Sequence, residues 1–280
     1  MNNIKKIIEK IVKQFPFAGY MDPANEVRNG YLNIAERVKR ILPVGSRVLD
    51  FGCGPCDKLA VLSMIGYKCW GFDDFSDDWH KRPGVTDSIR QFAIQNKITL
   101  IDSKADQGIG GKNYFDLIML NDVVEHLHDS PGPILNNLIE MIKDGGYLLI
   151  TVPNSVNIRK RFDVFFGKTN YPKFEYYYYH PVPYRGHIRE YTVGDLRQMC
   201  DFLRLEKMVL TGCDHMIYKV PKGMRHIYFG ITDLFPSLKD SIILIARKPQ
   251  KWRPDLFNDR KKIDKILGRS TTFKYTSPEL

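Results

Sequence analysis

The sequence predicts a Rossmann-like α/β fold, in which helices cover both faces of a doubly wound, mostly parallel sheet. Short apolar runs of strand length alternate with amphipathic segments of helix length along most of the 280 residues. The run at 147–154 is almost continuously apolar, as a parallel strand covered on both faces should be. Ligands in such folds bind at the carboxyl ends of the strands, so the residues after each predicted strand are the first candidates for a site.

Composition and charge narrow the class of protein. Hydrophobic residues make up 43% of the chain and charged residues 26%, which is typical of a globular protein. No apolar run approaches the ~18 residues that span a bilayer, and lysines interrupt the start of the chain, where a signal peptide would be apolar. Five cysteines do not indicate a disulfide framework, so we expect a cytoplasmic protein. The formal charge of +10 favours anionic partners without choosing among nucleic acid, membrane and small phosphates.

The stretch 45–67 predicts a strand, a glycine turn and a helix that ends in another glycine. The turn faces the positive end of the helix, where backbone N–H groups can meet a polar ligand. Gly52 and Gly54 have no Cβ, so the backbone can pass close to a bound nucleoside. The next strand, 67–74, contains Asp73 about 20 residues after the turn, where an acidic side chain commonly binds ribose hydroxyls. Together these residues predict a nucleoside site.

The same turn contains Cys53-Gly-Pro-Cys56, the spacing that thioredoxin-like oxidoreductases use. A redox pair can also follow a strand and open a helix, so position alone does not decide between the two functions. A thioredoxin domain has no role for Asp50 and Asp73, nor for about 200 further residues of alternating strand and helix. We therefore predict that Cys53 and Cys56 are small turn residues and not a redox pair.

The alternation of strand and helix continues as far as residue 248. The fourth strand matters most for function, because its carboxyl end presents Asn121, Asp122, Glu125 and His126. A Gly-Gly pair is expected to end the helix after it, and Thr192 is the expected N-cap of the last helix. The predicted elements after the second strand are strand 97–102, strand 115–120, helix 133–146, strand 147–154, helix 191–205, strand 207–213 and strand 241–248.

These segments resemble the successive motifs of class I S-adenosylmethionine-dependent methyltransferases, the broad group that includes the ubiquinone-pathway O-methyltransferases. The motifs are VLDFGCGPC, GFDD, FDLIMLNDVVEHL, DGGYLLITVPN and HIREYTVGDLRQMCDFLRLEKM. They occur in the family's order and spacing over residues 28–248. The resemblance implies a seven-stranded sheet with an antiparallel last strand, and S-adenosylmethionine lying across strands one to four. Cys56 replaces the third glycine of the family's turn.

The resemblance also implies roles in cofactor binding for Arg28, Gly52, Gly54, Asp73, Asp102 and Asn121. The two glycines would pass beside the methionine moiety, and Asp73 would bind the ribose hydroxyls through hydrogen bonds worth ~1.5–3 kcal/mol each. Asn121 falls where the family lines the pocket after strand four. Asp102 could face the adenine amino group or simply end a strand, and Arg28 could contact the cofactor carboxylate or lie on the surface.

Catalysis needs few protein groups, because the cofactor's sulfonium already makes its methyl group electrophilic. Orientation alone can supply ~7–11 kcal/mol, and a hydroxyl acceptor also needs a base. His126 and His187 are the candidate catalytic residues, although either could be a structural histidine. The run from Asp122 to His126 also resembles a Glu-x-x-Glu-His stretch with which some ubiquinone O-methyltransferases hold a divalent ion. Because Asp122 replaces the first glutamate, we predict no metal.

Residues 155–187, between the fifth strand and the last helix, are the least ordinary part of the sequence. They contain ten Phe or Tyr residues with six Lys or Arg among them. Long loops in compact domains are often lids or binding loops, and this one leaves the sheet on the side where an acceptor would bind. Aromatic and basic side chains suit a sugar, a phosphorylated small molecule or stacked bases. We expect an aromatic lid, and the alternative is a small satellite core.

We divide the chain into an N-terminal amphipathic helix at 1–27, a methyltransferase domain at 28–248 and a basic tail at 249–280. The first helix would cap the active site or rest on an anionic membrane. The predicted function is methyl transfer to an oxygen or nitrogen of a small molecule, such as a sugar, a glycan precursor or a phosphorylated metabolite. The alternatives are an RNA or protein methyltransferase and a non-catalytic cofactor-binding domain. No RNA-recognition module is visible in the sequence, and the glycine turn is intact.

Overall fold

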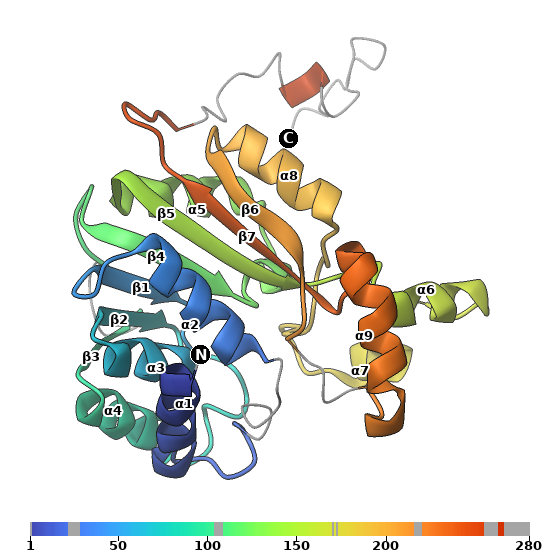
Figure 1. The fold of residues 1–280 in the computed structure, drawn as a ribbon, viewed down its shortest axis with the longest axis horizontal. Helices are drawn as coiled ribbons and strands as arrows, with labels where there is room; N and C mark the ends of the chain where they lie inside the picture. The colour runs from blue at the N-terminus through green and yellow to red at the C-terminus, as the bar shows by residue number, and fades with distance from the viewer. Residues whose placement is uncertain are drawn as a thin grey trace, which may run out of the picture.

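Seven strands form a single sheet in the order β3-β2-β1-β4-β5-β7-β6 (Figure 1). β1 to β5 are parallel, whereas β7 lies between β5 and β6 and runs antiparallel to both. This topology confirms the predicted doubly wound sheet and its antiparallel last strand. The strands are β1 (Arg47–Phe51), β2 (Lys68–Asp73), β3 (Ile98–Asp102), β4 (Phe115–Asn121), β5 (Ile142–Pro153), β6 (Glu206–Cys213) and β7 (Ser241–Arg247).

The computed structural model describes residues 2–21, 29–103, 109–169, 171, 173–215, 220–254 and 263–265. The predictions for Arg28 and for most of the tail at 249–280 therefore fall outside the described residues. The helices are α1 (Asn2–Gln14), α2 (Gly30–Ile41), α3 (Asp57–Ile65), α4 (Val85–Gln95), α5 (Pro131–Met141), α6 (Ile158–Phe165), α7 (Phe174–Tyr179), α8 (Val193–Phe202) and α9 (Arg225–Leu234). Short 3₁₀ helices are η2 (Val124–His126), η4 (Lys222–Met224) and η5 (Pro236–Leu238).

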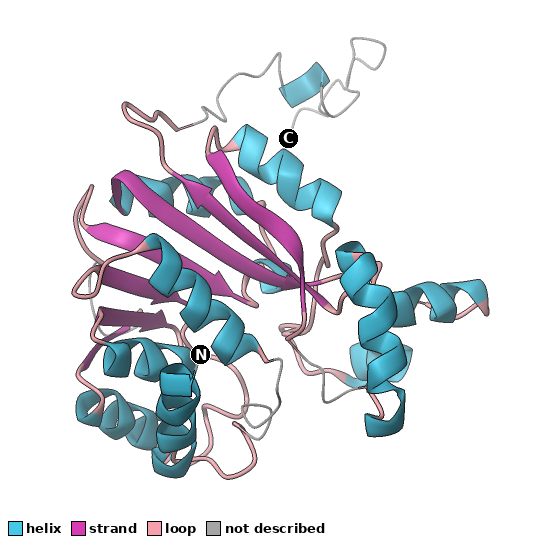
Figure 2. Cartoon of the chain, viewed as in Figure 1, coloured by secondary structure: helices cyan, strands magenta, loops and turns pink. Residues whose placement is uncertain are grey.

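Alternate residues of the central strands face two separate hydrophobic cores. In β4, Leu117 and Met119 join the core that α1, α2, α3 and α4 cover, whereas Ile118 and Leu120 join the core beneath α5 and α8. All four side chains are fully buried. A strand buried on both faces must be apolar at every position, which explains why the central strands read as apolar runs in the sequence. Figure 2 shows helices in front of the sheet and behind it.

The N-terminal helix α1 packs against α3 and α2. Its apolar face is buried, with Ile4, Ile8 and Ile11 at most 4% exposed. This face is therefore not available to lie on a membrane, and α1 extends the helical layer beside the glycine turn. Among the described residues, no helix has the length and apolar character needed to cross a bilayer.

The helix predicted at 133–146 ends earlier than the sequence indicated. α5 stops at Met141, and β5 begins at Ile142 and includes the Gly-Gly pair. The pairing of β4 with β5 shifts register between Phe115 and Leu117, as at a β-bulge. Gly145 adopts a φ of 80°, and a Cβ on Gly146 would lie 2.9 Å from the Asp116 carbonyl oxygen. The two glycines thus allow a bulge in β5, and they do not end a helix.

Substitution of Gly212 should destabilise the protein, because β6 and η5 meet at this residue. A Cβ there would lie 1.7 Å from the Pro236 carbonyl oxygen, a backbone atom that cannot rotate away. We expect Gly212→Ala to lower the free energy of unfolding by ~1–3 kcal/mol, measured by urea denaturation. Gly230→Ala in α9 is the matched control, since its Cβ would meet no described atom within 4 Å. Equal stability of the two variants would contradict this packing.

Candidate functional site

The turn after β1 depends on left-handed backbone conformations at three residues. The φ angles are 75° at Gly52, 50° at Gly54 and 64° at Cys56. A Cβ on Gly52 would lie 2.6 Å from Val123 Cγ2, so glycine is required for this close approach. A Cβ on Gly54 would meet no atom of the described residues within 4 Å. The turn is therefore tight on one side and open to a ligand on the other.

Asp73, the last residue of β2, holds the open side of this turn. Its Oδ2 accepts a hydrogen bond from the Gly54 backbone N–H at 2.8 Å, and its Oδ1 accepts one from the Phe75 N–H at 2.8 Å. Burial raises the pKa of Asp73, and these two backbone donors oppose the rise. The carboxylate retains lone pairs for a ligand, because each oxygen can accept a further hydrogen bond. Its place suits the predicted contact with ribose hydroxyls.

Asn121 and Asp50 connect the ends of β4 and β1 beneath the site. The Asn121 Nδ2 donates to Asp50 Oδ1 at 2.9 Å, and both side chains are buried. Burial raises the pKa of Asp50 to about 7, although the hydrogen bond from Asn121 opposes this. The Asn121 amide is thus used inside the protein, where it fixes the spacing of two strand ends. The contact between Asn121 and Asp50 depends on the register in which β1 and β4 pair, and the sequence alone does not show that register.

Asp102 lies beside Asp73, because β2 and β3 pair these two residues in register. The Arg90 Nη2 donates to Asp102 Oδ2 at 2.8 Å in an ion pair between α4 and the end of β3. This contact gives Asp102 a structural partner. A contact with adenine remains a prediction.

The two cysteines of the turn are buried free thiols. Cys53 Sγ and Cys56 Sγ lie 3.8 Å apart, and both residues are at most 3% exposed. Burial, followed by the hydrogen bond to Cys56, raises the pKa of Cys53 well above its ordinary value. A reactive redox cysteine needs a lowered pKa and access to solvent. These properties support the prediction that the pair packs the turn.

His126 and His187 lie together just beyond the carboxyl end of β4. Their ring centroids are 4.8 Å apart, and the rings are nearly perpendicular. His126 belongs to η2, which follows β4, and His187 lies at the end of the 155–187 segment. The Ile188 N–H donates to the Glu125 carbonyl oxygen at 2.7 Å, which fixes this segment against η2. The structure therefore brings together the two histidines that the sequence named as separate candidates.

The partners of the two rings indicate which ring nitrogen carries a proton. His126 Nδ1 lies 3.0 Å from the Arg185 carbonyl oxygen, and His187 Nδ1 lies 2.9 Å from Glu190 Oε1. A carbonyl or carboxylate oxygen can only accept, so Nδ1 is the donor in both rings. Nε2 then carries the lone pair of each neutral imidazole. Both histidines can accept a proton at Nε2.

Glu190 is a site residue that the sequence reasoning missed. It is half-buried beside His187, and its other carboxylate oxygen forms an ion pair with the Lys160 ammonium on α6. The positive charge of Lys160 favours the ionised form of Glu190, which in turn can orient His187 and stabilise it when protonated. The three-residue spacing between His187 and Glu190 was the available signal. Lys160 could not have been found, because it lies 30 residues away in sequence.

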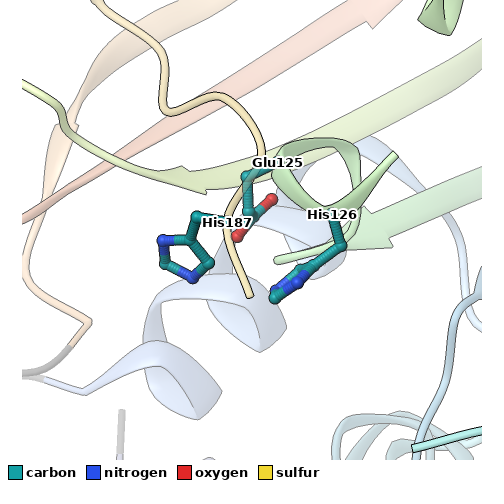
Figure 3. Close-up of side chains that lie close together, drawn as sticks. All are labelled: Glu125, His126 and His187. Atoms are coloured by element: carbon teal, nitrogen blue, oxygen red, sulfur yellow. The ribbon is translucent and has the colours of Figure 1, made fainter. Parts of the chain in front are cut away.

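Glu125 completes the cluster shown in Figure 3, where its side chain converges with those of His126 and His187. Glu125 is 0% exposed, and neither carboxylate oxygen has a hydrogen-bond partner in another described residue. Burial, with the nearby Asp122 carboxylate, raises its pKa well above the ordinary value. One donor atom from each of the three side chains lies within 4.8 Å of the other two. Such a nitrogen and oxygen set could hold a divalent ion; Asp122, which the sequence motif suggested as a ligand, is not in it.

The 155–187 segment divides into two parts with different surroundings. Nine of its ten aromatic side chains are exposed, and α6 and α7 contain no buried residue. The alternative of a satellite core is therefore wrong. The end of the segment is held on η2 and the residues after it, since the His128 ring bonds the Tyr184 carbonyl oxygen at 2.7 Å. This end lies against the histidines, and Lys160 of α6 reaches Glu190 beside them.

Comparison with known proteins agrees with this geometry. The family model of the methyltransferase domain matches residues 26–202. The chain therefore belongs to this methyltransferase family, and its sheet has the topology of the class I enzymes, whose cofactor is S-adenosylmethionine. No curated protein matches the sequence.

Solved structures show the same fold. A Haloferax volcanii methyltransferase, in a complex with a methyltransferase activator, is 12% identical with a TM-score of 0.54, and the match covers 89% of this chain and 99% of that one. A chain from Bordetella parapertussis, described as a possible exported protein, is 15% identical with a TM-score of 0.50, covering 88% and 79%. At these identities the structures support the fold alone.

Removal of the Asp73 carboxylate should weaken cofactor binding strongly. Asp73→Ala loses both the ribose acceptor and the hydrogen bond that shapes the Gly54 turn, so we expect the dissociation constant for S-adenosylhomocysteine to rise at least ~10-fold, or about 1.4 kcal/mol. Isothermal calorimetry measures this change. The neighbouring Asp74→Ala is the control, because the Asp74 carboxylate accepts hydrogen bonds from Ser76 and forms an ion pair with Arg185. Equal effects of the two substitutions would place the cofactor elsewhere.

Proposed function

We propose that this protein moves a methyl group from S-adenosylmethionine to an oxygen or nitrogen of a small molecule. A sugar, a glycan precursor or a phosphorylated metabolite is the favoured acceptor class. The observation that carries this proposal is the chain of contacts from His187 through Glu190 to Lys160, next to His126 at the end of β4. A partly exposed, oriented imidazole at the carboxyl ends of the strands is suited to accept a proton from a hydroxyl.

The cofactor half of the site would use the residues at the ends of β1, β2 and β4. The open face of Gly54 and the lone pairs of Asp73 fit a nucleoside, and Gly52 allows the turn to lie against Val123. We assign the ribose hydroxyls to Asp73 and the adenine amino group to Asp102. Asn121 shapes the floor of this pocket through Asp50. Arg28, outside the described residues, is the proposed partner of the cofactor carboxylate.

In the proposed reaction the bound cofactor supplies a methyl group made electrophilic by its sulfonium. With the cofactor bound, His187 Nε2 would accept the hydroxyl proton of the acceptor as the acceptor oxygen takes the methyl group and S-adenosylhomocysteine is left. The resulting imidazolium keeps its Nδ1–H bond to Glu190, and the carboxylate balances its charge. Lys160 holds Glu190 in position. His126, with its Nε2 on the same cluster, orients the acceptor. The products are a methylated acceptor and S-adenosylhomocysteine.

We infer that the reaction takes place in the cytoplasm, and the five free thiols support this location. No metal is needed, since Glu190 and the Arg185 carbonyl already orient the two rings. An RNA acceptor is the alternative that the charge of +10 favours. Assays with nucleotide sugars, phosphorylated metabolites and RNA would separate the acceptor classes.

His187→Ala should lower turnover far more than cofactor affinity. Loss of the base removes ~10²–10⁴-fold in rate for a hydroxyl acceptor, whereas the cofactor contacts lie on the other side of β4. S-adenosylhomocysteine formation gives the rate, and calorimetry gives the affinity. His226→Ala, an exposed histidine on α9, should leave both values unchanged. Glu190→Gln should reduce turnover less than His187→Ala and shift its pH profile.

A His187→Ala variant that retains full turnover would contradict the role of this histidine as base. Loss of activity on dialysis against a chelator, with recovery on adding a divalent ion, would instead assign the Glu125, His126 and His187 cluster to a metal.

A further inference from the structure

The helices α6, α7 and α9 project from the body of the protein on one side (Figure 1). In the view of that figure they lie past the carboxyl ends of the parallel strands, the end that carries the histidines. α6 and α7 contain no buried residue. The ion pair of Lys160 with Glu190 holds α6 to the rest of the chain, but helices without a fully buried side chain gain little stability from the packing that maintains most helices in globular proteins. Their exposed faces therefore indicate contact with something else.

The exposed side chains of this surface are large and aromatic. On α6 and just after it, Phe162 is 59% exposed, Phe165 81% and Phe166 70%. On α7, Phe174 is 71% exposed and Tyr179 80%. Monomeric proteins rarely expose contiguous apolar groups on this scale unless the surface binds a partner.

The charge of the same segment is positive. Residues 155–187 contain six Lys or Arg against two acidic residues, a net charge of +4. Arg159 and Arg161 lie on α6 among the phenylalanines, and Lys168 and Lys173 lie between α6 and α7. Aromatic rings flanked by basic side chains match the boundary of an anionic bilayer, where the rings sit at the level of the headgroups and the cations meet phosphates.

We propose that α6, α7 and the described residues between them (166–169, 171 and 173) form a docking surface for an anionic lipid bilayer. A second copy of the chain is disfavoured, because it would bring two surfaces of net charge +4 together. The contact is peripheral, with rings inserted to the depth of the headgroups and no spanning segment. Since the surface lies at the same end as the histidines, docking would bring the site close to an acceptor held in the membrane. This last consequence rests on the proposed function.

Co-sedimentation with lipid vesicles tests the docking surface. The purified full-length protein is mixed with vesicles of phosphatidylglycerol and phosphatidylcholine, or of phosphatidylcholine alone. We expect at least tenfold stronger partition onto the anionic vesicles, and weakening of that partition by 0.5 M salt. Phe165→Ser with Phe166→Ser should reduce it at least tenfold, as should Lys168→Glu with Lys173→Glu.

The control is Ile94→Ser, which removes a side chain that is 75% exposed on α4, at the opposite side of the molecule in Figure 1. It should bind vesicles like the wild type. Calorimetry with S-adenosylhomocysteine on every variant shows that the fold and the cofactor site are intact, so the failure of docking can be told from the failure of the proposed function. The inference is overturned if the wild type does not bind anionic vesicles, or if the phenylalanine variant binds them as strongly as the wild type does. A dimer that these substitutions dissociate, or an RNA oligonucleotide bound in preference to vesicles, would also overturn it.

Discussion

The hydrogen bonds that Asp73 accepts from Gly54 and Phe75 hold together the half of the site that we propose binds the cofactor. They tie the end of β2 to the turn after β1 through a single carboxylate. The turn has little freedom to rearrange on its other side, because Gly52 lies against Val123 and its N–H donates to the Phe72 carbonyl oxygen. The binding surface is therefore formed before a ligand binds. Binding then orders the protein less, and this lowers its free-energy cost. The hydrogen bond from Asn121 to Asp50 likewise ties the end of β4 to β1.

The acceptor half is built differently, from a loop fixed onto the sheet by few contacts. The Glu125 carbonyl oxygen accepts from Ile188, the Arg185 carbonyl accepts from His126, and Lys160 reaches Glu190 from α6. α6 thus contributes to the histidine cluster on one face and exposes its phenylalanines on another. If the membrane positions α6, it also acts on Lys160, so docking and catalysis would share an element.

Much of the fold could be predicted, because strands buried on both faces appear in the sequence as apolar runs. The glycine turn is likewise recognised from the spacing of its residues. The proposed cofactor residues Gly52, Gly54 and Asp73 were chosen from their positions along the chain, and the structure brings Gly54 and Asp73 into contact. The rest depended on contacts between distant segments. Asn121 was assigned to the pocket, but its amide is used by Asp50, a pairing set by strand register. The ten aromatics of 155–187 predicted either a lid or a core, and composition alone could not show that nine of them face outward.

The central claim is that the cofactor lies across the ends of β1 and β2 with its reactive end toward His126 and His187. A crystal structure with S-adenosylhomocysteine tests it most directly. We expect ribose hydroxyls within hydrogen-bond distance of the Asp73 carboxylate, adenine toward Asp102 and the sulfur on the side of the histidine cluster. Density for the ligand away from the glycine turn, or a sulfur directed away from both histidines, would contradict it.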